Sequence, residues 1–349
     1  MEINFWKGKN VLVTGHTGFK GSWLTMFLNN LGANVIGVSL EPEEEPSLYN
    51  QANVSNLCKH NICDIRDFHK LHGITSQEKI DIVFHLAAQS LVRRSYELPL
   101  QTFDVNVVGT ANILELIAQH ESVKVGIFAT TDKVYQNLEL GIPFKEDDRL
   151  GGHDPYSSSK AASELVIDSY CKSFFAIRDI AISSVRAGNV IGGGDWSQDR
   201  ILPDAVRAWD DRETLKIRSP NSIRPWQHVL DCLYGYMLLA EKLWDDQSLQ
   251  GAYNFGPSIA DAMSVIDIVK LASNTYDTHD FSIEDDSALH EAGFLSLDVS
   301  KATKNLGYNP CWAADEAVKK AMMWYKNFLN GQNALDLCNQ DIHEYLSSI

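Results

Sequence analysis

Two pairs of side chains in this sequence could do acid–base chemistry, and the first is Asp132 and Lys133 in TTDKVY, residues 130–135. The segment follows the apolar run VKVGIFA, which predicts a β-strand, and it is too polar to lie inside a sheet. A carboxyl and an amine side by side can act as acid and base when their surroundings adjust the two pKa values. The alternative is that Lys133 is a solvent-facing loop residue without a catalytic role.

The second pair is Tyr156 and Lys160 in PYSSSK. Proline is tolerated at a helix start, so Pro155 predicts a helix in which residues four apart share one face. A phenol titrates near ~10 and is a poor base at neutral pH unless positive charge favours phenolate, as the Lys160 ammonium and an oxidised nicotinamide would. Such a pair also arises by chance, and its weight comes from its place about 25 residues after TTDKVY.

Three glycines, Gly15, Gly18 and Gly21, are spaced G-x-x-G-x-x-G in TGHTGFKG. The motif lies between the predicted strand NVLVTG and the predicted helix FKGSWLTMFLNNLG, where a tight turn exposes backbone N–H groups at a helix N-terminus. Such a turn suits the pyrophosphate of a dinucleotide. The residues that we expect on its phosphate side are Thr17, Gly18, Phe19 and Lys20. The alternative is a glycine-rich helix start without a ligand.

An acidic residue at the end of the second strand usually binds the ribose hydroxyls of NAD. Here Ser39 stands at that point, and the acids that follow it are Glu41, Glu43, Glu44 and Glu45. These acids would repel a 2′-phosphate and no Arg or Lys nearby could bind one, so we predict NAD rather than NADP as the cofactor. Ser39 and the acids remain alternative ribose contacts.

Strands and helices alternate along the first half of the chain. The predicted strands are NVLVTG, NVIGVSL, HNICDI, IDIVFHLAA, VKVGIFATT and IAISSVRAGNV, and the helices between them include 100–119 and 156–175. This alternation predicts an α/β fold with a doubly wound parallel sheet of the Rossmann type. Ligands of such sheets bind outside the carboxyl ends of the strands, which is where both acid–base pairs fall.

The second half of the chain is less regular. It contains the loops GGGDW, ILPDA and RSPNSIRPW, helices near 201–210 and 228–243, and a final amphipathic stretch, ADEAVKKAMMWYKNFL. We expect residues 1–187 to form the NAD-binding domain, with returning segments near 228–255. Residues 188–349 are then expected to form mainly a smaller mixed α/β substrate-binding domain, interleaved with the first.

Composition argues against several other classes of function. The formal net charge of −16 argues against nucleic acid or an anionic membrane surface as a partner. No apolar run approaches the ~20 residues of a membrane span and the N-terminus lacks the apolar core of a signal peptide, so we expect a soluble cytoplasmic protein. The six cysteines are scattered without a paired motif, which predicts reduced thiols. His69 and His72 lack a third ligand at a useful spacing, so no metal site is expected.

Taken together, the motifs resemble the extended short-chain dehydrogenase/reductase family over nearly the whole chain. The matching segments are TGHTGFKG, CDIRD, HLAAQS, NVVGT, ATTDKVY, YSSSK and IRPWQHVLD. Within this family the chain looks most similar to the nucleotide-sugar 4,6-dehydratases. RAGNVIGGGDW, RILPD and RPWQHV resemble those members that act on CDP-glucose and serve deoxysugar and lipopolysaccharide O-antigen biosynthesis.

The resemblance implies a role for each residue of the two pairs. Tyr156 would take the proton of the sugar 4-hydroxyl while hydride leaves C4 for NAD⁺, assisted by Lys160, which also holds the nicotinamide ribose, and by a hydrogen bond from Thr131. Asp132 would protonate the departing 6-hydroxyl and Lys133 would remove the C5 proton, which requires a neutral amine. Most sugar 4,6-dehydratases have glutamate at that position, and the Asp-Lys pair resembles the CDP-glucose members.

The same resemblance implies the binding residues. Those expected to bind NAD are Gly15, Thr17, Gly18, Phe19, Lys20, Gly21, Asp64, Ile65, Leu86, Ala87, Ala88, Gln89, Asn106, Thr130, Tyr156 and Lys160. Those expected to bind the sugar nucleotide are Ser90, Arg93, Asn189, Arg200, Ile201, Leu202, Pro203, Arg224 and Asn254. Singly, Arg200 or Arg224 could equally be a structural ion-pair residue, and a plain turn is an alternative for glycines 192–194.

Alternative functions remain at this stage. A dehydratase for dTDP- or GDP-sugars would use the same residues, and an epimerase or decarboxylase would need Tyr156 and Lys160 but not Asp132 and Lys133. A dinucleotide-binding scaffold without turnover would need none of them. Helices 100–119 and 156–175 resemble those that pair into a homodimer in this family, although their faces could also pack within one chain.

Overall fold

The structure is a computed structural model that describes residues 1–43, 45–258, 261–278, 280–284 and 294–349. Glu44, one of the acids that follow the second predicted strand, lies outside the described residues. Within these residues, no helix combines the length and the apolar character needed to cross a membrane.

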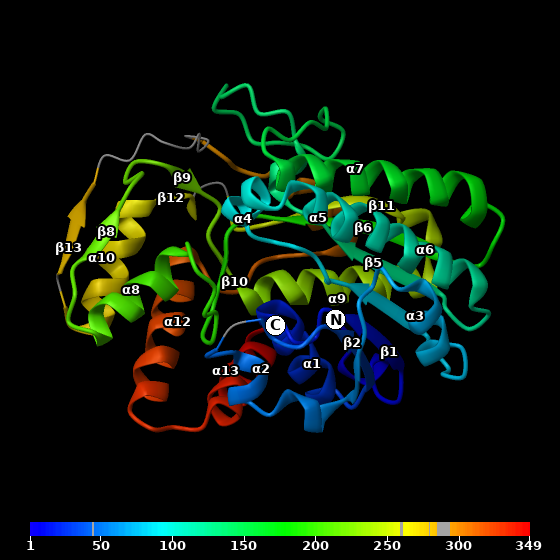
Figure 1. The fold of residues 1–349 in the computed structure, drawn as a ribbon, viewed down its shortest axis with the longest axis horizontal. Coiled ribbons are helices and arrows are strands. Elements are labelled where there is room, and N and C mark those ends of the chain that lie inside the picture. Colours follow the sequence, from blue (N-terminus) through cyan, green and yellow to red (C-terminus); the bar gives the residue numbers. More distant parts are fainter. Residues whose placement is uncertain (44, 259–260, 279, 285–293) are drawn as a thin grey trace.

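A seven-stranded sheet forms the centre of the molecule (Figure 1). Its strands are β1 Asn10–Thr14, β2 Asn34–Ser39, β3 Lys59–Ile62, β4 Ile82–His85, β5 Val125–Ala129, β6 Ala181–Ala187 and β11 Gly251–Phe255. All neighbours pair in parallel, in the order β11-β6-β5-β4-β1-β2-β3. The order reverses between β1 and β4, which is the switch point where such sheets bind ligands. The predicted doubly wound fold is confirmed.

Alternate residues of the strands enter two separate cores, one on each face of the sheet. In β1, Val11 and Val13 belong to one core and Leu12 to the other. The first core is completed by α1 Phe19–Asn30 and α9 Val229–Asp245, and the second by α6 Gly109–Gln119 and α7 Pro155–Tyr170. Both faces are therefore covered, which is why the strands are apolar almost throughout.

The two predicted long helices are interrupted. Residues 99–119 form α5 Pro99–Phe103, a π-helical turn at Asp104–Val108 and then α6. Helix α7 likewise continues into a π-helical turn at Cys171–Phe175. The shorter helices that lie in the first half of the chain are α2 Leu48–Gln51, α3 Phe68–Thr75 and α4 Val92–Glu97.

The second half builds three small strand pairs and five further helices among the described residues. The pairs are β7 Val190–Ile191 with β10 Gln227–His228, β8 Leu215–Ile217 with β13 Phe281–Ile283, and β9 Ile223–Arg224 with β12 Met263–Ser264. The helices are α8 Ile201–Asp210, α10 Val265–Tyr276, α11 Ser300–Leu306, α12 Ala314–Leu329 and α13 Ala334–Ser348. The amphipathic stretch is α12, and the sequence analysis did not foresee α13 beyond it.

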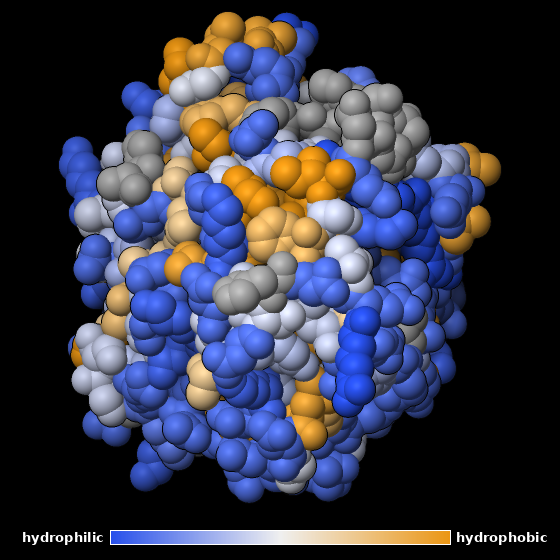
Figure 2. All heavy atoms as spheres, turned by 90° about the vertical axis from the view of Figure 1, so that its left-hand side faces the viewer, coloured by the Kyte–Doolittle hydropathy of each residue, from blue (hydrophilic) through white to orange (hydrophobic). Residues whose placement is uncertain are grey.

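The two halves are joined through the sheet. β11 pairs with β6, so residues 251–255 belong to the main sheet although they follow the second-half loops. The division at residue 187 stays a prediction. Figure 2 shows the side of the molecule formed by α8, α10 and α12, which is mostly hydrophilic with hydrophobic side chains in small groups.

Candidate active site

The glycine-rich turn joins β1 to α1 and cannot carry side chains at two of its glycines. Gly15 has φ +79°, and a Cβ there would lie 2.7 Å from the Ala87 backbone nitrogen. A Cβ on Gly21 would lie 2.0 Å from the Gly15 carbonyl oxygen. Gly18 precedes the first residue of α1, so Phe19 and Lys20 form its first turn. The turn thus offers helix N–H groups in a cradle of bare backbone, which fits a dinucleotide pyrophosphate.

The end of β2 lies against this turn. The Thr17 and Ser39 hydroxyl oxygens are 2.8 Å apart, and Thr17 also donates to the Leu40 carbonyl at 2.8 Å. The Thr17 side chain therefore joins the turn to the end of β2, and the assignment of Thr17 to the phosphate side of the cofactor stays a prediction. Of the acids after β2, Glu43 forms an ion pair with Arg94.

The other cofactor candidates follow strands β3 and β4. The Asp64 carboxylate pairs with Arg66 at 2.6 Å, and Arg66 holds its pKa below the usual value although burial raises it. Ile65 is buried, and a Cβ on Gly109 would meet its Cδ1 at 2.4 Å. The three residues that follow β4, all half-buried, are Leu86, Ala87 and Ala88.

Asn106 ties these loops to α7. Its amide oxygen accepts from the Gln89 backbone N–H at 2.9 Å, and its amide nitrogen donates to the Gln89 carbonyl at 3.0 Å and to the Ser159 hydroxyl at 2.8 Å. Gln89 in turn donates to Thr102 at 2.9 Å. The assignment of Asn106 to the NAD site stays a prediction.

The two acid–base pairs meet beyond the end of β5. Thr131 and Asp132 are buried, and the Thr131 hydroxyl donates to Asp132 at 3.0 Å. Tyr156, at the start of α7, also hydrogen-bonds with Thr131. One turn later, the Lys160 ammonium donates to the Ala129 carbonyl at 3.0 Å. The structure therefore brings together Thr131, Asp132, Tyr156 and Lys160 from a strand end and a helix start.

Burial dominates the ionisation of this cluster. It raises the pKa of Tyr156 to about 12, against the opposing effects of the Thr131 hydrogen bond and the Arg200 charge. The expected lowering of the phenol pKa by Lys160 and an oxidised nicotinamide together stays a prediction. Burial and then repulsion from Lys20 lower the pKa of Lys160 to about 8. Burial raises the pKa of Asp132, in the predicted direction, although the Lys133 charge opposes it.

Asp132 has an atom with no protein partner. Its Oδ2 is buried without a hydrogen bond, and a Cβ on Gly188 would lie 2.9 Å from it. Lys133, the next residue, is half-buried in the 3₁₀ turn Asp132–Val134. The charges of Lys133 and Arg224 both act on this carboxyl. The charge of Asp132 in turn acts on the Tyr156 phenol, so the acid is electrostatically linked to an amine, an arginine and the phenol.

The predicted substrate residues divide into groups. Arg200 and Arg224 act electrostatically on Tyr156 and Asp132, respectively, although Arg200 Nε also lies 3.6 Å from Asp195. Arg93 Nε lies 3.4 Å from Asp199, which also contacts Arg218 at 3.1 Å. The exposures of the remaining candidates differ: Ser90 is exposed, Asn189 and Ile201 are half-buried, and Leu202 and Pro203 are buried.

Asn254 makes its side-chain hydrogen bonds within the protein. It lies on β11 and is fully buried, and its amide oxygen accepts from the Tyr135 hydroxyl at 2.6 Å. Its amide nitrogen donates to the carbonyls of Phe144 at 2.9 Å and Asp298 at 3.2 Å. The assignment of Asn254 to substrate binding stays a prediction.

Thr130, whose assignment to the NAD site stays a prediction, leads to residues that the sequence analysis missed. Its hydroxyl donates to Glu164 at 2.6 Å, and Glu164 forms a buried ion pair with Arg186. The signal available in the sequence was the position of Glu164, four residues after Lys160 on the same helix face. Arg186 had no local signal, because β6 brings it there from elsewhere in the chain.

Comparison with known proteins assigns the family. A family model described as GDP-mannose 4,6 dehydratase matches residues 12–321. The chain belongs to this family. The predicted resemblance to nucleotide-sugar dehydratases is thereby confirmed.

Relatives and solved structures agree with this family. The whole chain is 42% identical to the CDP-glucose 4,6-dehydratase of Salmonella typhimurium, of which it covers 99%. It is 27% identical to the dTDP-D-glucose 4,6-dehydratase of Bos taurus, with 93% of this chain and 91% of that protein covered. The structure of epimerase Mth375 from Methanothermobacter thermautotrophicus superimposes with a TM-score of 0.81 at 24% identity, covering 94% of this chain and 95% of that chain. At that identity the likeness concerns the fold.

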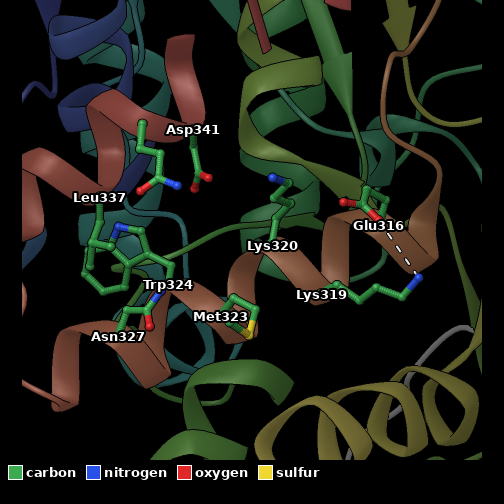
Figure 3. Close-up of a pocket in the computed structure, with 9 residues that line it drawn as sticks. Glu316, Lys319, Lys320, Met323, Trp324, Asn327, Leu337 and Asp341 are labelled. Atoms are coloured by element: carbon green, nitrogen blue, oxygen red, sulfur yellow. Dashed lines mark ion pairs between the residues drawn. The ribbon is translucent and has the colours of Figure 1, made fainter. Parts of the chain in front are cut away.

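A pocket away from this site lies between α12 and α13 (Figure 3). Lys320 and Asp341 both extend into it, and Trp324 closes one end. None of the predicted cofactor or substrate residues lines it. Likewise, no group of three or more His, Cys, Asp or Glu suited to a metal ion occurs in the part of the chain that the structure describes.

Proposed function

We propose that the protein is an NAD-dependent hydro-lyase that converts CDP-glucose to CDP-4-keto-6-deoxyglucose and water. The observation that carries the proposal is the buried Asp132 Oδ2, which has no protein partner and lies beside Lys133 and the Thr131–Tyr156 hydrogen bond. An acid placed next to a phenol is required for dehydration and not for epimerisation. The 42% identity with a CDP-glucose 4,6-dehydratase over the whole chain supports the choice of substrate.

NAD⁺, when bound at the glycine-rich turn, supplies the chemistry of accepting hydride from C4 and returning it to C6. In the first step Tyr156, as phenolate, takes the 4-hydroxyl proton. The phenol pKa of about 12 in the protein alone must fall for this transfer. The positive charge of an oxidised nicotinamide in the same dry site would lower it. Lys160 stays next to the Ala129 carbonyl and orients the helix start.

Asp132 and Lys133 then carry out the elimination. The 4-ketone acidifies the C5 proton, neutral Lys133 takes it, and Asp132 gives its proton to the departing 6-hydroxyl, which leaves as water. Burial raises the pKa of Asp132, so the carboxyl keeps its proton until it transfers that proton to the 6-hydroxyl. The Lys133 ammonium formed in this step, after exchange with solvent, would return a proton to C5 and so complete the 4-ketone product.

Arg200 and Arg224 are proposed to bind the nucleotide diphosphate. Their guanidinium groups act on the two catalytic side chains that would face the sugar, and arginine pairs well with phosphate oxygens. Arg93, Ser90 and Asn189 are proposed as further contacts. Leu202 and Pro203 would do so only through their backbone, because both side chains are buried.

The decisive experiment is incubation with CDP-glucose and NAD⁺ in heavy water. A dehydratase forms a 4-ketone with deuterium at C5 and no net NADH, whereas an epimerase forms a C4 epimer and a non-catalytic scaffold forms no product. Parallel incubations with dTDP-glucose and GDP-mannose test which nucleotide base the enzyme prefers. Faster turnover of either compound would show that CDP-glucose is not the preferred substrate.

We further propose a homodimer that pairs through α5, α6 and α7. These helices pack against each other and carry apolar side chains that are exposed in the single chain. The exposed fractions are 86% for Leu100 on α5 and 64% for Leu165 on α7, and 42% and 46% for Leu98 and Val108, which directly precede α5 and α6. In sedimentation, the wild type should be a dimer and Leu165→Glu a monomer. A monomeric wild type would contradict the proposal.

A cytoplasmic location is part of the same proposal, because both the cofactor and the nucleotide sugar are cytoplasmic metabolites and all six cysteines are unpaired. A 4-keto-6-deoxy sugar nucleotide is the intermediate from which deoxysugars are made. We therefore place the reaction in deoxysugar biosynthesis, for lipopolysaccharide O-antigen. Loss of O-antigen deoxysugars on deletion of the gene would test this assignment.

A further inference from the structure

A buried ion pair lies directly beneath the catalytic segment. The Glu164 and Arg186 side chains are 5% and 4% exposed, and Arg186 Nε donates to Glu164 Oε1 at 2.9 Å. Arg186 also donates to Oε2 at 2.9 Å, so the pair is bidentate. Such pairs combine charge with fixed geometry, because the guanidinium plane matches the carboxylate.

Each partner of the pair also binds one end of the segment Thr130–Tyr135. Glu164 accepts from the Thr130 hydroxyl at 2.6 Å, and Arg186 donates to the Tyr135 hydroxyl at 2.9 Å. The Arg186 guanidinium also lies 4.9 Å from the centre of the Tyr135 ring. The segment that carries Asp132 and Lys133 is thus anchored on both sides by one ion pair.

The pair also links this segment to the other catalytic residues. Glu164 lies on α7, one turn after Lys160 and two turns after Tyr156, and Arg186 lies on β6 next to β5. The Ser184 hydroxyl donates to Glu164 at 2.7 Å, and Arg186 donates to the Glu146 carbonyl at 2.9 Å. A single polar network therefore contacts β6, α7 and the segment Thr130–Tyr135 that follows β5.

The electrostatics agree with a fixed ion pair. Burial by itself would raise the pKa of Glu164, but Arg186 and the Thr130 and Ser184 hydroxyls lower it below the usual value. The pair is ionised and satisfied, so removing one charge would leave the other buried and unpaired. Apolar side chains could stabilise this strand end without the free energy that burying two charges costs. A role in positioning therefore explains the buried ion pair better than a role in stability alone.

We propose that the Glu164–Arg186 pair is a positioning element, which sets Asp132 and Lys133 relative to Tyr156 and Lys160 so that elimination follows oxidation on the same sugar. The proposal rests on the proposed dehydratase function. Neither residue reaches the reacting atoms, so neither is catalytic. A displacement of about 1 Å at a catalytic group can cost about 100-fold in rate.

The test compares Glu164→Gln with Asp168→Asn. Asp168 lies one turn further along α7 in an exposed ion pair with Lys172 at 2.7 Å, so it is the matched loss of one acid from the same helix. We expect Glu164→Gln to lower kcat by about 30- to 100-fold with KM for CDP-glucose within about 3-fold. Reduced nicotinamide should then accumulate in a single turnover, because oxidation at C4 continues while elimination is slow. Asp168→Asn should match the wild type.

A readout without turnover separates this proposal from the proposed function. Amide hydrogen exchange of residues 130–135 should speed up in Glu164→Gln and stay unchanged in Asp168→Asn, whatever the substrate is. If Glu164→Gln does not fold, Thr130→Val and Tyr135→Phe each remove one anchor and leave the ion pair. The proposal would be overturned if Glu164→Gln kept the kcat and the amide exchange of the wild type. The same result in both Thr130→Val and Tyr135→Phe would also overturn it. Wild-type protein inactive on CDP-glucose would refute only the proposed function.

Discussion

The Lys160 ammonium donates a hydrogen bond of 3.0 Å to the carbonyl oxygen of Ala129, the last residue of β5. This contact joins the helix that carries Tyr156 to the strand that leads into Thr131 and Asp132. The two acid–base pairs are therefore held against each other by regular elements rather than by mobile loops. Variants of single residues should consequently separate the steps of the reaction.

Tyr156→Phe should abolish the first step. We expect kcat to fall by about 100- to 10,000-fold, because the proton acceptor for the 4-hydroxyl is lost. Deuterium should not enter C5, since elimination requires the ketone. Tyr170→Phe is the matched control, because it removes a phenol from the same helix, where that hydroxyl donates to Glu115 at 3.2 Å. Normal C5 labelling by Tyr156→Phe would contradict the assignment.

Asp132→Asn should stop the reaction one step later. An amide cannot protonate the 6-hydroxyl, so turnover should fall by about 100-fold or more while C4 oxidation continues. The measurement is the absorbance of reduced nicotinamide after one turnover, which should persist in this variant and be transient in the wild type. Turnover by the wild type should also fall as pH rises through the raised Asp132 pKa, since only the acid form acts.

Lys133→Ala tests the base. Loss of the amine should slow C5 deuterium exchange by about 100-fold, while oxidation at C4 stays intact. Lys145→Ala, an exposed lysine, serves as the control. Full C5 exchange in Lys133→Ala would return Lys133 to the alternative of a loop residue.

Arg224→Gln should weaken substrate binding. Loss of a charge-assisted hydrogen bond of about 1.5–3 kcal/mol predicts a 10- to 100-fold rise in KM for the sugar nucleotide. The affinity for NAD⁺ should not change, and Arg212→Gln, at an exposed position after α8, should behave as the wild type. A change in NAD⁺ affinity alone would place Arg224 on the cofactor side.

Asp341 should make stability depend on pH. Burial raises its pKa from the ordinary 3.8 to about 7, Glu344 acts in the same direction and Lys320 opposes it, in the pocket of Figure 3. Between these two values the folded state holds a proton that the unfolded state has lost. The stabilisation is present at pH 4 and disappears as pH rises through 7.

Asp341→Asn removes this titration. Relative to the wild type, its free energy of unfolding should rise by about 2–4 kcal/mol between pH 4 and 8, as measured by urea denaturation. Asp210→Asn, at an exposed position, should show no such change. Parallel curves for Asp341→Asn and the wild type would contradict the raised pKa.

Several features of the site could be predicted because they depend on neighbours in the chain. The need for glycine at Gly15 and Gly21 follows from a tight turn between a strand and a helix, and the spacing of Tyr156 and Lys160 follows from the helical repeat. The doubly wound parallel fold followed from the alternation of strands and helices, and β11 lies in the returning segment that was expected near 228–255. The three small strand pairs of the second half and the helix α13 were not foreseen.

The tertiary structure decided which polar groups are buried and what they bind. It placed the side chains of Asn254 and Asn106 in hydrogen bonds within the protein, raised the pKa of Tyr156, and paired Glu164 with Arg186 across two elements. Spacing along one strand or helix is a property of backbone geometry that the sequence determines locally. Burial and hydrogen-bond partners arise only when distant elements pack together, so no single segment contains them.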